Sequence, residues 1–103
     1  MRGKHLVLTS ETQEEIHNLL EAFQNYGTKF IIVGDIGADL EVLRDQEPKG
    51  VDVVEDGIDF FFSYGGFEIR FGAEVYFTNT TVVVSNQSPS GQNWFEWTFI
   101  VTE

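Results

Sequence analysis

Residues 67–78 read Phe-Glu-Ile-Arg-Phe-Gly-Ala-Glu-Val-Tyr-Phe-Thr, and this stretch decides the fold class. Every second residue from Phe67 to Phe77 is apolar, which is the period of a β-strand with one buried face. Glycine inside such a pattern often marks a bend. We therefore expect either one long strand or two strands joined near Gly72.

The same period extends in both directions along the chain. Asp56-Gly57 separates two such segments and is a strong signal for a two-residue hairpin turn. Gly65-Gly66 predicts the next turn, and residues 86–93 form the longest predicted loop. The segments that we expect to be strands in this part of the chain are residues 51–55, 58–63, 81–85 and 94–102.

The first third of the chain has a different pattern. Ile16, Leu19, Leu20 and Phe23 form one apolar stripe at helical spacing. Ser10 with Gln13 matches a capping box, and Tyr26-Gly27 predicts a helix end with glycine in the left-handed conformation. We expect a helix over residues 10–26, between a strand at residues 4–9 and a strand at residues 28–34 that is buried on both faces.

Residues 35–45 are ambiguous, because Ile36, Leu40 and Leu43 have helical spacing while Gly37 disfavours a helical first turn. We expect a single α+β domain over residues 1–103. Its antiparallel sheet would have five to six strands, with the helix at residues 10–26 on one face. We also consider a short second helix at residues 36–45.

The charge balance excludes several classes of partner. Seventeen acidic residues face six basic ones, for a formal net charge of −11. Direct binding to nucleic acid or to an anionic membrane needs Lys and Arg, so we expect neither. The absence of cysteine excludes disulfides and thiol nucleophiles. No apolar run approaches the roughly 20 residues of a membrane span, and no signal peptide is evident, so we expect a cytoplasmic protein (of the host cell, if a phage encodes it).

Residues 35–59 hold nine acidic residues against only Arg44 and Lys49. Such a cluster can be a solvated surface that keeps a small protein soluble. It can also be a nucleic-acid mimic, whose carboxylates occupy a groove built for phosphates. Phage-encoded antagonists of restriction, CRISPR or repair enzymes, and immunity proteins that block nucleases, share this charge and size.

The aromatic content raises a second question. Ten Phe, three Tyr and two Trp are more than one face of a sheet can bury. An exposed aromatic face would suit a partner or self-association. The candidates for exposed aromatic side chains are Phe61, Tyr64, Tyr76 and Trp94.

Evidence for catalysis is weak. Residues 30–43 resemble the opening motif of calcineurin-like metallophosphoesterases, an apolar strand followed by Gly-Asp-x-His-Gly. Gly37, however, occupies the position of the metal-binding His, and Ala38 that of the following Gly. The acidic residues near Asp56 lack the spacing of a calcium loop. We therefore expect no catalytic residues, no metal site and no cofactor.

These observations predict a non-enzymatic acidic protein that blocks a basic, nucleic-acid-binding surface of a partner protein. The alternative is a small assembly protein that forms a homodimer or larger oligomer through an aromatic sheet face. The predicted partner-binding residues are Asp35, Asp39, Glu41, Asp45, Glu47, Asp52, Glu55, Asp56, Asp59, Phe61, Tyr64, Tyr76 and Trp94.

Overall fold

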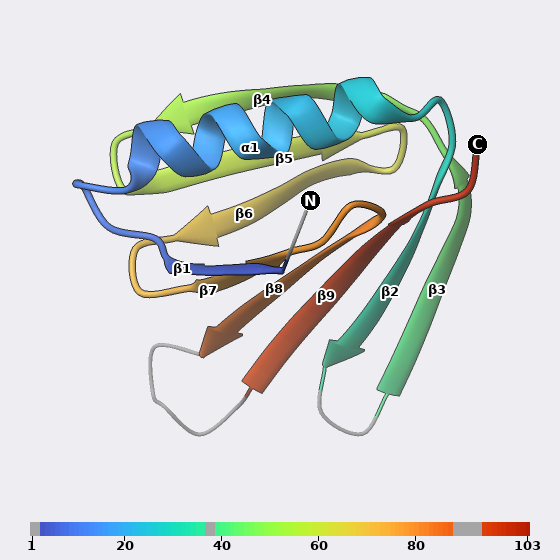
Figure 1. The fold of residues 1–103 in the computed structure, drawn as a ribbon. Helices are drawn as coiled ribbons and strands as arrows, with labels where there is room; N and C mark the ends of the chain where they lie inside the picture. The colour runs from blue at the N-terminus through green and yellow to red at the C-terminus, as the bar shows by residue number, and fades with distance from the viewer. Residues whose placement is uncertain (1–2, 37–38, 88–93) are drawn as a thin grey trace.

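The computed structural model describes residues 3–36, 39–87 and 94–103. Within these residues the chain forms one helix and nine strands, arranged in two antiparallel sheets (Figure 1). The α+β class with a main amphipathic helix is confirmed. The sequence predicted a single sheet, whereas the structure adds a separate sheet of three strands.

The larger sheet has six strands and the smaller has three. In spatial order, the six-stranded sheet contains β1 (Lys4–Val7), β7 (Glu74–Phe77), β8 (Thr81–Gln87), β9 (Trp94–Val101), β2 (Phe30–Ile36) and β3 (Asp39–Gln46). The three-stranded sheet contains β4 (Pro48–Val54), β5 (Gly57–Phe62) and β6 (Gly65–Arg70).

The long alternating segment divides at Gly72, where the backbone adopts a φ of 98° that favours glycine. β6 lies before this corner and belongs to the three-stranded sheet, while β7 follows it and belongs to the six-stranded sheet (Figure 1). Of the two predicted arrangements, two strands joined near Gly72 is the one that the structure shows. Phe67 on one side and Val75 on the other both point into the core.

The core lies between the two sheets and is dominated by phenylalanine. The rings of Phe60 and Phe99, one from each sheet, meet edge to face with centroids 4.8 Å apart. Phe30 and Phe62 make a similar contact at 5.2 Å. Such contacts stabilise aromatic pairs beyond the burial of their area. The sheets therefore share one apolar interior.

Helix α1 (Gln13–Tyr26) buries Ile16, Leu20 and Phe23, as the apolar stripe predicts. Its ends differ from the prediction. The predicted capping box of Ser10 and Gln13 is wrong: the N-cap is Thr12, which makes no side-chain capping bond, and the Gln13 side chain binds Val54 and Gly57 instead. The helix begins at Gln13, three residues later than expected. Gly27 is extended (φ −135°) rather than left-handed. Glycine is required there by close approach, since a Cβ atom would lie 2.6 Å from a methyl carbon of Val101.

A polar stripe on α1 lies against the edge of β4. Gln13 Nε2 donates to the carbonyl oxygens of Val54 and Gly57, both at 2.8 Å. Gln24 is buried; its Nε2 donates to Phe61 O at 2.7 Å, and its Oε1 accepts from Gly50 N at 3.0 Å. His17 Nε2 lies 3.2 Å from Val51 O. The helix thus pairs with backbone groups of the edge strand β4 and of the adjacent β5.

The prediction of a short second helix at residues 36–45 is wrong. From Asp39 onward this segment is strand β3, which pairs with β2 in an antiparallel register that places Val42 opposite Val33. The pairing satisfies backbone groups of both strands, and Leu43 packs against the core beside Ile32. Long-range pairing therefore outweighed the local helical spacing. Gly37 and Ala38 lie outside the described residues.

Both predicted hairpin turns exist, but each lies earlier in the chain than the glycines suggest. The β4–β5 turn consists of Glu55-Asp56, and the β5–β6 turn of Ser63-Tyr64. Gly57 is instead the first residue of β5. A Cβ atom there would lie 2.0 Å from the carbonyl oxygen of Ile69, so packing explains this glycine.

Candidate functional site

Four of the nine predicted acidic residues come together on the three-stranded sheet. Asp52 of β4 pairs directly with Asp59 of β5, which pairs in turn with Glu68 of β6. Residues directly opposite in neighbouring strands share a face of the sheet. Glu55 and Asp56 lie in the turn at the end of the β4–β5 hairpin. We call this surface the acidic face; its members are Asp52, Glu55, Asp56, Asp59 and Glu68.

Arg70 is the one basic residue that forms ion pairs with the acidic face among the described residues. Its guanidinium nitrogens lie 3.0 Å from Asp59, 2.8 Å from Glu68 and 3.5 Å from Asp56. Burial opposes the charged form of Arg70. The hydrogen bond to Asp59 and the charges of the three carboxylates outweigh that effect and raise the pKa of Arg70 above its ordinary value. One cation among five carboxylates leaves the acidic face strongly negative.

The other predicted acidic residues lie elsewhere. Glu47 is 3.7 Å from both Lys29 and Lys49, so its charge is balanced locally. Asp45 has a left-handed backbone (φ 55°) beside the bulge where the β2–β3 register shifts, which gives it a local structural role. Asp35 is exposed in β2, and the side chain of Asp39 lies outside the described part of the chain.

Of the predicted exposed aromatics whose side chains are described, Tyr76 lies on a different sheet from Phe61 and Tyr64. Tyr64 is 60% exposed in the β5–β6 turn, and Tyr76 is 48% exposed on the six-stranded sheet. Phe61 is partly covered; it lies on the three-stranded sheet against Gly66, where a Cβ atom would be 2.7 Å from its ring. The side chain of Trp94 lies outside the described residues.

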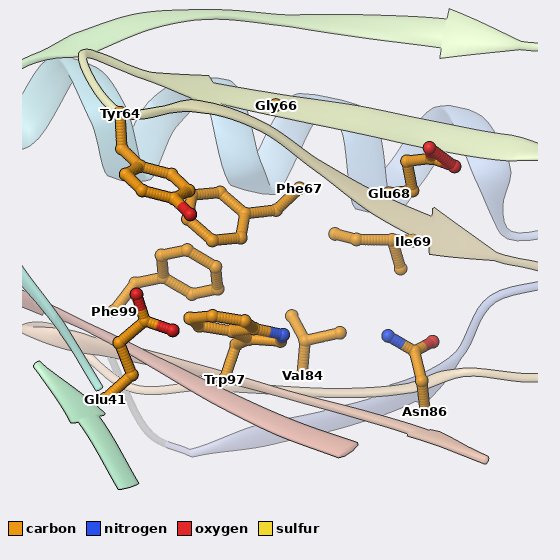
Figure 2. Close-up of a pocket in the computed structure, with 10 residues that line it drawn as sticks. All are labelled: Glu41, Tyr64, Gly66, Phe67, Glu68, Ile69, Val84, Asn86, Trp97 and Phe99. Atoms are coloured by element: carbon orange, nitrogen blue, oxygen red, sulfur yellow. The ribbon is translucent and has the colours of Figure 1, made fainter. Parts of the chain in front are cut away.

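Glu41, the remaining predicted acidic residue, lines a pocket between the two sheets. The pocket has a volume of about 260 Å³ and runs beside β6 on one side and beside β3, β8 and β9 on the other (Figure 2). Figure 2 shows Glu41 and Tyr64 at one end of it and Glu68 and Asn86 at the other, with aromatic side chains between them. We call it the aromatic pocket; its aromatic members are Tyr64, Phe67, Trp97 and Phe99.

Trp97 has a fixed position in this pocket. It pairs across strands with Gly34, and a Cβ atom on Gly34 would lie only 2.5 Å from the indole. The indole therefore covers the glycine backbone. Trp97 also meets Phe67 edge to face, with ring centroids 4.8 Å apart.

The sequence analysis named Glu41 and Tyr64 as partner-binding residues, without predicting a pocket, and did not name Trp97, Asn86 or Glu68. The local sequence pattern does not show that β6 crosses over this part of the six-stranded sheet. Glu68 lies outside the acidic segment 35–59, and its place beside Asp59 follows only from the strand register.

The outer face of the six-stranded sheet is covered by no other described element. A row of paired positions crosses it from β1 to β3: His5, Tyr76, Val83, Thr98, Val33 and Val42. Tyr76 and Val42 are both exposed large apolar side chains. A parallel row is more polar and includes Glu74, Ser85, Glu96 and Asp35. This face is therefore neither a sealed core nor a purely charged surface.

In the described parts of the chain, no three His, Asp or Glu side chains are close enough together to hold a metal ion. The single helix found there is too short to cross a bilayer.

The fold and these surfaces define a small acidic α+β protein with a layered two-sheet core. No protein-family profile matches the sequence, and no curated protein matches it. Among solved structures, the crystal structure of the Bacillus subtilis YojF protein is similar. The likeness covers 95% of this chain and 94% of YojF, with a TM-score of 0.57 and 11% sequence identity. At that identity the likeness shows a shared fold alone.

Proposed function

We propose that this is a non-enzymatic binding protein whose acidic face blocks a basic, nucleic-acid-binding surface of a partner protein. One observation carries the proposal: Asp52, Asp59 and Glu68 stand in register across three neighbouring strands. Neighbouring strands lie about 4.8 Å apart, so the row is a closely spaced array of carboxylates on a stiff frame. Like charges directly opposite in a sheet are destabilising, and binding a cationic surface would relieve that repulsion.

The charge would act mainly on the rate of encounter. Carboxylates at a surface steer a basic partner and raise the association rate, while apolar contacts limit dissociation. Tyr64, an exposed aromatic residue directly before β6, would supply such a contact. A partner surface rich in Lys and Arg is typical of enzymes that handle nucleic acid, whose phosphate contacts use those residues.

The test reverses the charge of three exposed members of the acidic face. In the variant Asp52→Lys, Glu55→Lys, Asp56→Lys, Asp59 is kept because it holds Arg70. Immobilised protein is used to capture basic proteins from cell lysate at low salt, and captured proteins are challenged with duplex DNA. We expect the triple variant to lose the captured protein, and DNA to displace that protein from the unmodified chain.

A matched control carries the same change in net charge at other sites, Glu21→Lys, Glu74→Lys, Glu96→Lys. These residues lie on α1 and on the outer face of the six-stranded sheet. We expect the control to retain the partner. Equal loss in both variants would mean that total charge, and not the acidic face, governs capture. If duplex DNA does not displace the captured protein, the proposal that the acidic face mimics nucleic acid is refuted.

A second candidate function is self-assembly through the outer face of the six-stranded sheet. It is favoured by the row containing Tyr76, Val83, Val33 and Val42, which is open to solvent in the single chain. Sedimentation distinguishes the two functions. A tight oligomer that persists in high salt supports assembly, whereas a monomer supports the blocking protein.

A further inference from the structure

The aromatic pocket combines flat apolar walls with hydrogen-bond acceptors at both ends. Tyr64, Phe67 and Trp97 line it, and the side chains of Glu41 and Asn86 lie at opposite ends (Figure 2). Among the described residues that line this pocket there is no Lys or Arg. The composition therefore suits a ligand that is cationic and has a flat face.

Of the two acidic residues that line the pocket, Glu41 is the one without an ion pair or hydrogen bond to another described side chain. It is partly buried, yet it forms no ion pair or hydrogen bond with any other described residue. Asp59 is satisfied by Arg70, and Glu47 lies near two lysines. A carboxylate in a partly enclosed aromatic pocket gains most from a donor that is itself charged.

Trp97 supplies the surface on which such a cation would rest. Tryptophan has the most favourable ring face for a cation. Its position is fixed in advance by Gly34 beneath it and Phe67 beside it, so little ordering is needed on binding.

The size of the pocket limits the ligand. At about 260 Å³ it lies below the roughly 300–1,000 Å³ of pockets that hold drug-sized ligands. It can take a single planar group with a short stem. Quaternary ammonium groups have no N–H to offer Glu41 or the side-chain oxygen of Asn86, whereas guanidinium has five donors in a rigid plane.

We propose that the aromatic pocket binds the guanidinium group of an arginine side chain from the partner protein, stacked on Trp97 and paired with Glu41. The inference rests on the proposed function, because it makes the partner's basic surface the source of the arginine. β6 is an edge strand of the smaller sheet, with Glu68 on the acidic face and Phe67 in the pocket. A partner on the acidic face that extends around this edge would reach the pocket mouth.

The test titrates the isotope-labelled chain with Nα-acetyl-arginine methylamide and follows the indole N–H signal of Trp97 by NMR. We expect a saturable shift, and binding at least tenfold weaker for the neutral citrulline analogue, which has nearly the same shape. Methylguanidine is a second probe. Binding of methylguanidine without binding of the acetylated arginine amide would overturn the assignment to a protein side chain.

Two variants with the same chemical change complete the test. Glu41→Gln removes the charge in the pocket and should weaken binding about tenfold or more, as expected for loss of a charge-assisted hydrogen bond. Glu96→Gln lies next to Trp97 in sequence but on the opposite face of the sheet, and should stay within about twofold of the unmodified chain. Equal weakening in both variants, or no saturable shift at all, would overturn the proposal.

The triple charge reversal on the acidic face separates this proposal from the proposed function. If that variant loses the partner protein but still binds the arginine amide, both proposals stand. If the unmodified chain captures a DNA-competed partner but does not bind the amide, the pocket assignment alone is overturned.

Discussion

Trp97 illustrates how a single glycine determines the position of a functional side chain. The indole lies over Gly34 of the neighbouring strand, where a Cβ atom would be only 2.5 Å from the ring. Glycine in a strand costs packing and backbone entropy, and aromatic residues often cover such positions across the sheet. The arrangement holds one wall of the aromatic pocket in place.

Gly34→Ala is therefore expected to destabilise the fold although it adds only one methyl group. The clash forces Trp97 to move away from the core, at a cost of about 1–3 kcal/mol in the free energy of unfolding. Urea denaturation followed by circular dichroism measures this change. Asp35→Ala, at the exposed neighbouring position, serves as the control and should change stability by about 0.5 kcal/mol or less. Equal stability of the two variants would mean that the indole moves freely.

Helix α1 contributes more than its apolar stripe, because its glutamines act on the edge of the smaller sheet. Gln24 is the buried polar side chain among the described residues, and both ends of its amide are used. The bond to Gly50 N falls where the β4–β5 register shifts between Pro48 and Gly50. The amide thus replaces strand pairing at an irregular point of the sheet.

Gln24→Leu should consequently be costly even though leucine is a good helix former. It leaves Gly50 N and Phe61 O without their partner, at about 1–3 kcal/mol for each buried group that stays unpaired. Thermal unfolding checks this, and we expect Gln24→Leu to melt well below Asn25→Leu, its exposed neighbour on the helix. Similar melting temperatures would show that water replaces the amide.

Elements with a strong local pattern could be predicted from the sequence. The stripe Ile16, Leu20 and Phe23 identified the helix, and the alternation around Gly72 identified β6, β7 and the bend between them. Both patterns reflect a one-sided contact with a core, which the chain encodes residue by residue.

What depends on contacts between distant segments could not be predicted. Leu40 and Leu43 are spaced as in a helix, and only the pairing with β2 makes them part of a strand. Gly57 resembles a turn residue, but it is glycine because β6 approaches it closely. The aromatic pocket has the same origin, since it exists only where β6 crosses over β9.

Repulsion among carboxylates acts on the molecule as a whole. A formal net charge of −11 on 103 residues opposes the compact state, and on the acidic face a single arginine pairs with only three of the five carboxylates. Salt screens such interactions, with a Debye length of about 8 Å at physiological ionic strength.

We therefore expect the melting temperature to rise when sodium chloride is increased from low to moderate concentration. Differential scanning calorimetry measures the change. The triple charge reversal on the acidic face should flatten this dependence, because it removes the clustered repulsion. A clear fall in melting temperature with added salt would contradict clustered repulsion in the native state.

The corner at Gly72 joins two sheets whose phenylalanines fill a common interior. Neither sheet can detach without exposing the rings of the other, so partial opening is as costly as complete loss of structure. Heating should accordingly give one cooperative transition, with equal calorimetric and van't Hoff enthalpies. A protease cut at the corner would divide the six-stranded sheet between two fragments, since β1, β2 and β3 precede Gly72 and β7, β8 and β9 follow it, so neither fragment could form that sheet alone.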